Sequence, residues 1–391
     1  MSEDVRLPTA KVPHPVVSVI ILGWNGLEYV DECLASVLDQ DFERPYEVLF
    51  VDNGSSDGTP ERVAAYPSVI LHRLDRNYGY CQGNNIGYGH ASGDYVVFLN
   101  QDVVVHRSWL REFVAAVEGD PAIRAAHANI IQPWYPEFGA MERVEPAAVA
   151  YTADLSPLGL VHYRKLSGAS PVVDTMFLHG VSIIVKRELI DELGYVFDPD
   201  MFAYAEDLDL ALRTRALGYR TVVATRATVY HKHTLESRPS LRAFVKTVRI
   251  IRNRLLALWK CSTWPEFVPL ALVTIAGAPF NAGEFGLSPL RRAAYFILLV
   301  PPALLAVPAA IAAMPSYAGR RRAVLKTRRV GRWWFLRTIL SSRRLGLRAP
   351  ASITAPADGA CAASDTSTWR WPARSWPCCC GRRTSRTWRA R

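Results

Sequence analysis

Short apolar runs that stop abruptly at polar residues alternate with helix-like stretches over the first hundred residues of the chain. The runs at residues 17–22, 47–51 and 95–99 are rich in β-branched and aromatic side chains, which favours strands. Helix-like patterns lie at residues 29–40 and from residue 59 onward. Strands that alternate with helices at this spacing predict an α/β fold with a largely parallel sheet covered on both faces.

The residues that end these runs are the first candidates for a ligand site, because the crevice of such a sheet lies beyond the carboxyl ends of its strands. Asn25 follows the first run, Asp52 and Asp57 lie in the turn DNGSSDG after the second, and Asp102 lies in FLNQDV after the third. Asn, Asp, Ser and Gly are also common in ordinary turns, so each segment alone has a structural explanation. Carboxylates gathered at one edge favour a ligand site.

Size, charge and cysteine pattern narrow the class of protein. The chain has 391 residues and is 50% hydrophobic, which excludes a wholly disordered chain and predicts two organisational units. Its formal net charge of +10 favours an anionic partner, which can be nucleic acid, a phospholipid surface or a phosphorylated substrate. The cysteine spacing fits neither a disulfide framework nor a zinc site, and the first residues lack a secretory pattern, so we expect the first part of the chain in the reducing cytoplasm.

Five segments, in order along the chain, carry a family resemblance. They read VSVIILGWNG, VLFVDNGSSDGT, NYGYCQGNNIGYGHASGDYVVFLNQDV, FLHGVSIIVKRELIDELGYVFDPDMFAYAEDLDLALRTRALGY and ATVYHKH. Over residues 16–260 the chain resembles the catalytic domain of glycosyltransferase family 2, and within it the bacterial rhamnosyltransferase-like branch. The resemblance implies the GT-A fold, a Rossmann-like mixed, mostly parallel sheet that binds a nucleoside-diphosphate sugar.

The resemblance places the donor at the strand ends. It implies that Asp52 holds the nucleotide base and ribose, that residues 53–58 form the adjoining loop, and that residues 77–85 lie against the nucleotide. Glycines in these segments allow close backbone approach. The donor-binding residues implied are Asn25, Asp52, Asn53, Gly54, Asp57, Asn77, Gly79, Asn85, Asn100 and Gln101.

FLNQDV occupies the place of the family's DxD metal motif. The resemblance implies that Asp102 binds a divalent cation, Mg²⁺ or Mn²⁺, which bridges the donor's diphosphate. This sequence departs from DxD because Asn100 stands first, a version familiar in the rhamnosyltransferase-like branch. A histidine near the metal and diphosphate is also implied and corresponds to His231, with His233 close enough to confuse the assignment.

The segment Tyr-Ala-Glu-Asp-Leu-Asp-Leu opens a helix that carries the implied catalytic base. Asp207 is the first candidate for the base and Glu206 the second, although acidic residues in a first helical turn are often only partners of the helix dipole. At helical spacing Asp209 and Arg213 are expected to form a structural pair. An acceptor hydroxyl needs such a base and the departing diphosphate needs a cation, which together suffice for a single displacement with inversion.

His179 and Gly180 match the position of a family motif near the acceptor and the donor sugar. The resemblance does not choose the sugar: rhamnose is favoured, and galactofuranose or glucose on dTDP, UDP or GDP stay open.

Composition changes after the implied catalytic region. Basic and apolar residues alternate at 242–255, apolar runs occupy 268–280 and 293–314, and an arginine-rich stretch extends from 320 to 348. We expect a membrane hairpin or re-entrant pair, with the arginines on anionic lipid and the catalytic domain at the cytoplasmic face. A buried helical hairpin in a soluble protein is the alternative.

The expected organisation is an extension at 1–15, a GT-A domain at 16–240, a membrane-associated helical region at 241–348 and a disordered tail at 349–391. The acceptor expected at the membrane is a saccharide or a polyprenyl-linked saccharide in cell-wall or surface polysaccharide synthesis.

Three other functions are alternatives to sugar transfer. A sugar nucleotidyltransferase needs a basic, glycine-rich triphosphate loop near the first strand, and LGWNGLEY contains no basic residue. A nucleic-acid-binding protein is disfavoured because the arginines cluster beside apolar segments instead of on the α/β domain, so no nucleic acid partner is expected. A non-catalytic nucleotide-sugar-binding protein stays open.

Overall fold

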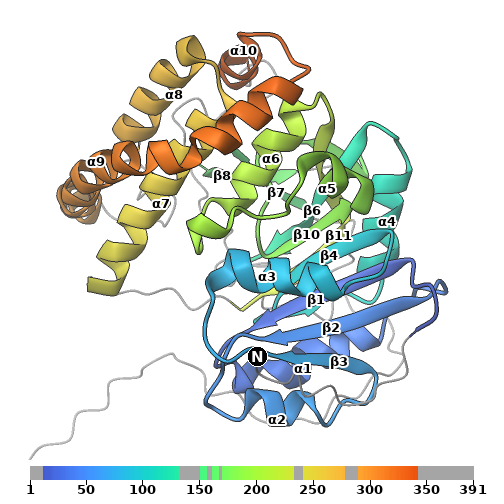
Figure 1. Cartoon of the computed structure of the whole chain (residues 1–391). Coiled ribbons are helices and arrows are strands. Elements are labelled where there is room, and N and C mark those ends of the chain that lie inside the picture. The colour runs from blue at the N-terminus through green and yellow to red at the C-terminus, as the bar shows by residue number, and fades with distance from the viewer. Residues whose placement is uncertain are drawn as a thin grey trace, which may run out of the picture. The chain divides into compact units, whose positions relative to one another are not determined.

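The computed structural model describes residues 12–132, 150–155, 161–166, 170–232, 241–277 and 289–341. A mixed, nine-stranded sheet lies at the centre of the described chain, in the order β3-β2-β1-β4-β10-β6-β11-β5, with β9 paired to β11 (Figure 1). A separate antiparallel pair consists of β7 (Ala150–Leu155) and β8 (Val161–Leu166). The central strands are β1 (Val17–Gly23), β2 (Tyr46–Asp52), β3 (Val69–Arg73), β4 (Tyr95–Asn100), β5 (Val103–Val105), β6 (Ile123–Ile131), β9 (Val172–Asp174), β10 (Ser182–Lys186) and β11 (Arg220–His231).

The direction of the strands brings the candidate residues to one edge. Strands β1 to β4 are parallel neighbours where they pair, as the alternating pattern predicts. Strand β10 then runs antiparallel to both β4 and β6, while β6 and β11 are parallel. The carboxyl ends of β1, β2, β4, β6 and β11 therefore share an edge with the beginning of β10.

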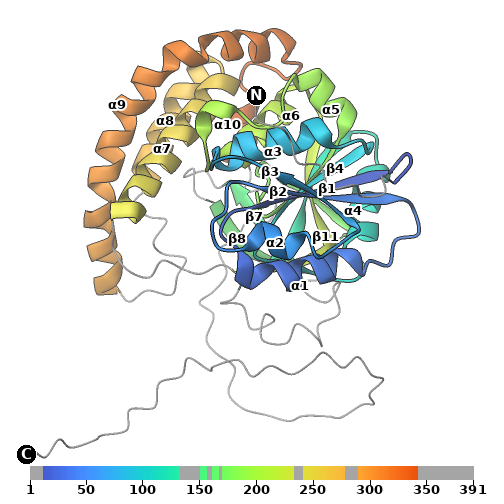
Figure 2. The same ribbon diagram turned by 60° about the horizontal axis from the view of Figure 1, so that its bottom comes forward.

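Helices cover both faces of the sheet, and the alternation of side chains along each strand explains the two cores. Ile20 points to one core, with Cys81 of α3 and Leu208 of α6. Val19 and Ile21 point to the other, with side chains of α1 and α4. Figure 2 shows α1 and α3 on opposite sides of the strands. These helices are α1 (Leu27–Leu38), α2 (Thr59–Val63), α3 (Gly79–His90), α4 (Trp109–Glu118), α5 (Arg187–Leu193) and α6 (Glu206–Ala216).

Four further helices, α7 (Leu241–Cys261), α8 (Trp264–Gly277), α9 (Pro289–Thr327) and α10 (Trp334–Ser341), form the predicted helical region. Helix α7 packs against both α6 and α9. Its buried Leu256, together with Ala306 of α9, belongs to the same hydrophobic core as Phe98 of β4. The helical region thus shares a core with the sheet. The tail predicted after residue 348 lies outside the described residues.

Candidate active site

The loops that follow β1, β2 and β4 are fastened to one another at the shared edge. The Asn25 backbone N–H donates to Ser55 Oγ at 2.9 Å, and Asn25 Oδ1 accepts from the Ser56 N–H at 2.9 Å. The Gln101 side chain bonds the backbone of Trp24 twice, with Oε1 accepting at 3.2 Å and Nε2 donating at 3.0 Å. The side chains of Asn25 and Gln101, both predicted to bind the donor, therefore connect these loops to one another.

Asp52 lies at the end of β2 with 1% of its surface exposed. Its Oδ2 accepts from the Ser55 N–H at 3.3 Å, whereas Oδ1 has no hydrogen-bond partner in the described part of the chain. Burial raises the pKa of this carboxyl. Because an unsatisfied buried acceptor is costly, a ligand N–H or O–H at Oδ1 would be stabilised there.

The next loop is held against this edge by amide side chains. Asn53 Oδ1 accepts from the Tyr78 N–H at 2.9 Å, and its Nδ2 donates to Asn77 Oδ1 at 3.2 Å. Asn77 Oδ1 also accepts from the Gly79 N–H at 2.8 Å. Gly54 has a φ of +75°, and a Cβ there would lie 2.6 Å from the backbone of Arg76, so this close approach requires glycine.

Two other predicted donor residues make hydrogen bonds within the chain. Asp57 accepts from the backbone N–H of Leu27 and of Thr59, each at 3.0 Å, at the first turns of α1 and α2. Asn85 exchanges two hydrogen bonds with the backbone of Phe197, at 2.8 and 3.1 Å. Direct donor contact by either side chain stays a prediction.

Asp102 and His231 come together as the resemblance implies. Strand β5 pairs with the end of β11 so that His231 faces Val103, and the Lys232 N–H donates to the Asp102 carbonyl at 2.8 Å. His231 Nε2 lies 3.2 Å from Asp102 Oδ2, and its Nδ1 lies 3.2 Å from Gln132 Oε1. Asn100 ends β4 at the same edge of the sheet. His233, the other histidine considered for the metal, lies outside the described residues.

One carboxylate and one imidazole suit Mg²⁺ or Mn²⁺ when a substrate diphosphate supplies further oxygen ligands. The Asp102 side chain is 27% exposed and can reach such a ligand. Within the described ranges no cluster of three His, Cys, Asp or Glu side chains could hold a metal on its own. The residues present therefore fit a cation that is shared with the donor.

Asp207 is held at the same edge by the segment before β10. Its Oδ2 accepts from the Gly180 N–H at 3.0 Å, and its Oδ1 accepts from the Leu208 N–H at 2.7 Å. The Asn100 N–H donates to the Val181 carbonyl at 3.0 Å, which connects this segment to the end of β4. Burial raises the pKa of Asp207 to about 6.

Glu206 precedes Asp207 and is 6% exposed, with no partner for Oε2 among the described residues. Burial, and then the charge of Asp207, raise the pKa of Glu206 well above its ordinary value. Burial and the neighbouring carboxylate therefore disfavour a negative charge on Glu206 beside Asp207. A Cβ at Gly180 would lie 3.3 Å from Asp207 Oδ2 and 3.4 Å from Glu206 Oε1, so a larger residue would crowd both carboxyls.

His179 precedes Gly180 in the segment that leads into β10. Its Nδ1 accepts from the Val181 N–H at 3.4 Å, and its ring centroid is 6.5 Å from that of His127. His127 is buried, which lowers its pKa to about 4 and keeps it neutral.

The turn that leads into α6 is strained and is held by a residue that the sequence did not indicate. Phe202, Tyr204 and Ala205 have φ values of 61°, 73° and 66°, a region that non-glycine residues rarely adopt. The side-chain amide of Asn253 on α7 donates to the carbonyls of Met201, Ala203 and Tyr204 at 3.0, 3.1 and 2.9 Å. Strain of this kind persists only where neighbouring structure enforces it, so α7 fixes the position of the Glu206–Asp207 pair.

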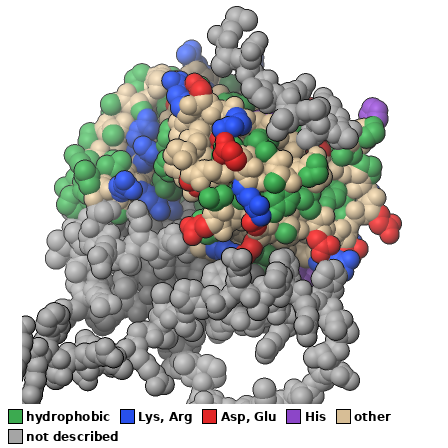
Figure 3. Space-filling model, turned by 90° about the horizontal axis from the view of Figure 1, so that it is seen from below, with side chains coloured by type: hydrophobic (Ala, Val, Ile, Leu, Met, Phe, Trp, Pro, Cys, Tyr) green, Lys and Arg blue, Asp and Glu red, His purple; other side chains and the backbone are tan. Residues whose placement is uncertain are grey.

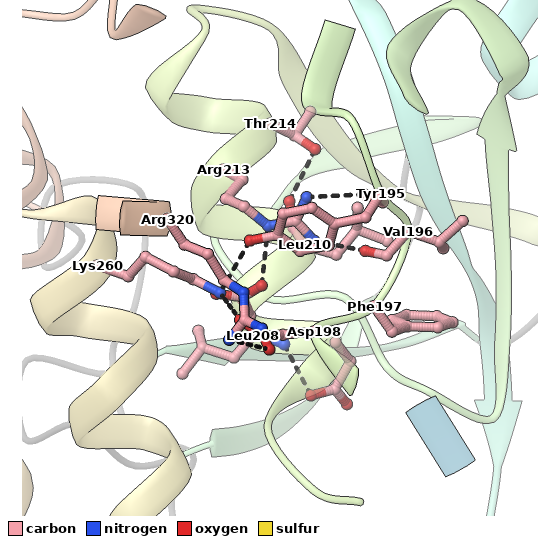
Figure 4. Close-up of polar contacts among 12 residues, drawn as sticks. Tyr195, Val196, Phe197, Asp198, Leu208, Leu210, Arg213, Thr214, Lys260 and Arg320 are labelled. Carbon is pink, nitrogen blue, oxygen red and sulfur yellow. Dashed lines mark hydrogen bonds and ion pairs between the residues drawn. The ribbon is translucent and has the colours of Figure 1, made fainter. Parts of the chain in front are cut away.

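A largely buried ion cluster lies beside α6 (Figure 4). Asp209 pairs with Arg213 at 2.8 Å, which confirms the predicted pair, and also with Lys260 of α7 at 2.8 Å. Lys260 reaches Asp198 at 2.6 Å, and Arg320 of α9 lies 3.0 Å from Asp198. Burial opposes ionisation of Asp209, yet Lys260 and Arg213 lower its pKa overall. The cluster joins α6, α7 and α9.

Comparisons with known proteins agree with this geometry. Residues 18–194 match the family model described as glycosyl transferase family 2. Glycosyltransferase AglE of Haloferax volcanii is 37% identical over 110 residues, which is 27% of this chain and 36% of that protein. Poly-beta-1,6-N-acetyl-D-glucosamine synthase of Staphylococcus aureus is 26% identical over 208 residues, 52% of this chain and 47% of the synthase. The chain thus spans less than half the length of these two relatives.

A solved structure supports the fold. GalNAc-T7, crystallised with UDP, GalNAc and Mn²⁺, aligns with a TM-score of 0.51 over 65% of this chain and 50% of its own, at 17% identity. None of these matches singles out the rhamnosyltransferase-like branch, which stays a prediction. By family match and by fold, residues 18–194 belong to glycosyl transferase family 2 and lie in a domain with the GT-A fold.

Proposed function

We propose that this chain transfers a sugar, with inversion, from a nucleoside-diphosphate sugar to an acceptor hydroxyl. The observation that carries the proposal is the meeting of two groups at one sheet edge: the Glu206–Asp207 pair and the Asp102–His231 pair. The first provides a base for the acceptor and the second suits a cation at the leaving diphosphate. The family match supports the same reaction class.

Asp207 is the proposed base. The N–H groups of Gly180 and Leu208 orient its carboxylate, and the raised pKa of about 6 makes it a stronger base than an ordinary aspartate while leaving it ionised at neutral pH. The raised pKa of Glu206 disfavours a second negative charge beside Asp207. As the acceptor oxygen attacks the anomeric carbon, Asp207 takes its proton, and the bond to the diphosphate oxygen breaks on the opposite side of that carbon.

The nucleotide is proposed to lie across β1, β2 and β4, with Asp52 Oδ1 accepting from its base or ribose. Asp102 and His231 would hold Mg²⁺ or Mn²⁺, which stabilises the negative charge on the departing diphosphate when bound. The UDP and Mn²⁺ in the GalNAc-T7 structure support this arrangement. Rhamnose is the favoured sugar because the motifs resemble the rhamnosyltransferase-like branch.

The proposed acceptor is a saccharide or polyprenyl-linked saccharide at the cytoplasmic face of the membrane. One helical stretch, Pro301–Thr327, is long and apolar enough to cross a bilayer, and most of its apolar part is not buried in the protein. That exposed apolar surface supports membrane association, and the donors of such reactions are cytoplasmic.

Sugar transfer is tested with the full chain, membranes as acceptor source, and labelled dTDP-rhamnose, UDP-galactofuranose, UDP-glucose or GDP-linked sugar, with and without Mg²⁺ or Mn²⁺. We expect metal-dependent transfer from one of these donors. Nucleotide binding without transfer from any donor would favour a non-catalytic binding protein. Release of pyrophosphate from a nucleoside triphosphate and a sugar phosphate would instead indicate a nucleotidyltransferase.

Asp52→Asn is expected to weaken nucleoside diphosphate binding by about 10- to 100-fold, because a hydrogen bond to a charged acceptor contributes about 1.5–3 kcal/mol. Calorimetric titration of the variant with UDP, GDP and dTDP measures this change. Asp31→Asn is the control, since Asp31 forms an exposed ion pair with Arg62. If wild type and Asp52→Asn bound nucleotide with equal affinity, Asp52 would not contact the donor.

A further inference from the structure

Helix α9 presents a continuous stripe of exposed side chains at helical spacing. Leu304, Leu305 and Ile311 are 69%, 54% and 59% exposed. The stripe changes from apolar to basic along the helix, and its members are Pro301, Leu304, Leu305, Pro308, Ile311, Ala312, Pro315, Arg322 and Lys326. An apolar face that continues into lysine and arginine is typical of a helix that lies at a membrane interface.

Helix α8 carries a second exposed apolar stripe. Trp264, Val268 and Leu272 follow one another at four-residue spacing and are 58%, 51% and 63% exposed. Of the large hydrophobic side chains exposed in the described ranges, all but Trp24, Leu27 and Phe202 lie in the helical region. Figure 3 shows such side chains gathered at the left, where α9 lies in Figure 1, beside lysines and arginines.

The opposite side of α9 is fixed to the protein. Ala303, Ala306, Ala310 and Tyr317 are buried, and α9 packs along α7, as Figures 1 and 2 show. Arg328, just beyond the helix, pairs at 2.8 Å with Glu266 of α8, which is fully buried. Helix α9 therefore cannot enter a bilayer without its neighbours.

Helix α7 makes a spanning orientation costly. It carries basic residues along its length, Arg242, Lys246, Arg249 and Arg252. If α9 crossed the bilayer, these side chains would be drawn toward the hydrocarbon, where each costs about 2.5–3.5 kcal/mol at the centre. With α9 at the surface these cations stay outside the hydrocarbon, and the exposed Arg332, Trp333 and Arg337 after α9 suit a membrane interface.

We propose that the exposed stripes of α8 and α9 dock in the plane of an anionic bilayer and that α9 does not cross it. The apolar part of the α9 stripe is about 20 Å long at 1.5 Å per residue, and the cations that follow it match anionic headgroups. Because α6 contacts both α7 and α9, the catalytic helix lies close to the docked layer. The purpose of this placement, access to a lipid-linked acceptor, rests on the proposed function.

Flotation of the full chain with vesicles of phosphatidylcholine, or of phosphatidylcholine with phosphatidylglycerol, tests the docking surface. We expect wild type to float with anionic vesicles, and Leu304→Glu/Ile311→Glu to bind at least about tenfold more weakly. Arg322→Glu/Lys326→Glu is expected to weaken binding to anionic vesicles by a similar factor in low salt. Arg44→Glu/Arg111→Glu, exposed cations outside the helical region, is the matched control and should bind as wild type.

Three outcomes would overturn the proposal. If Leu304→Glu/Ile311→Glu bound vesicles as tightly as wild type, the exposed stripe of α9 would not be the docking surface. Retention of wild type in membranes after carbonate extraction at high pH would indicate that α9 spans. A wild-type dimer in light scattering that this variant abolishes would assign the stripe to a second copy.

Titration with nucleoside diphosphates in the absence of lipid separates this proposal from the proposed function. Nucleotide affinity should be unchanged in every variant. Failure of wild type to bind nucleotide would count against the proposed function but would not affect the docking proposal.

Discussion

Asp207→Asn is expected to lower kcat for sugar transfer by about 10²- to 10⁴-fold, the usual contribution of a general base. The amide can still accept a hydrogen bond from Gly180 but cannot take a proton from the acceptor. Donor affinity is expected to change little, because the proposed donor contacts lie at Asp52 and at the Asp102–His231 pair. Initial rates at saturating donor and acceptor, with a separate nucleotide titration, measure both quantities.

Glu206→Gln is the matched control for that variant. Burial raises the pKa of Glu206 well above its ordinary value and so favours its neutral form, and an amide of the same shape should preserve most of the rate. If Glu206→Gln abolished transfer while Asp207→Asn kept it, the base would be Glu206, the second candidate from the sequence.

Lys260→Met is expected to lower the free energy of unfolding by about 3–5 kcal/mol, because it leaves Asp198 and Asp209 buried with part of their charge uncompensated. All three side chains are fully buried, so solvent cannot replace the lost ammonium. Urea unfolding followed by tryptophan fluorescence measures the change. Lys326→Met, the same substitution at an exposed position of α9, should cost less than about 0.5 kcal/mol. A similarly small loss for Lys260→Met would show that the cluster contributes little to stability.

The parallel half of the sheet could be predicted from the sequence because its signals are local. Apolar runs mark β1, β2 and β4, and polar residues mark their ends. The antiparallel insertion of β10 between β4 and β6 depends on pairing between distant segments, which no local pattern encodes. That insertion brings Gly180 to Asp207, so only the family resemblance indicated their common site.

The residues of the candidate site, too, could be predicted only in part. Asp102 and His231 meet as expected, and Asp207 lies at the predicted edge. Asn53 and Asn85, in contrast, use their amides to hold neighbouring loops. Asn serves turns and ligands with the same donor and acceptor atoms, so its place in a motif cannot separate the two roles.

Residues of the C-terminal helices that support the site were missed for a physical reason. The pattern at 242–255 predicts a basic surface helix, and nothing in it distinguishes Asn253 or marks the following Lys260 as buried. Their partners, the strained turn before α6 and the carboxylates of Asp198 and Asp209, are identified only once α7 is packed against α6.

The pH dependence of kcat/KM tests most directly the central claim that Asp207 removes the acceptor proton. Burial raises the pKa of Asp207 to about 6 and only the ionised form acts as a base, so the rate should be constant at higher pH and fall about tenfold per pH unit below that value. The residual rate of Asp207→Asn should lack this decline. A wild-type decline only near the ordinary aspartate pKa of about 4, or the same decline near pH 6 in Asp207→Asn, would contradict the assignment.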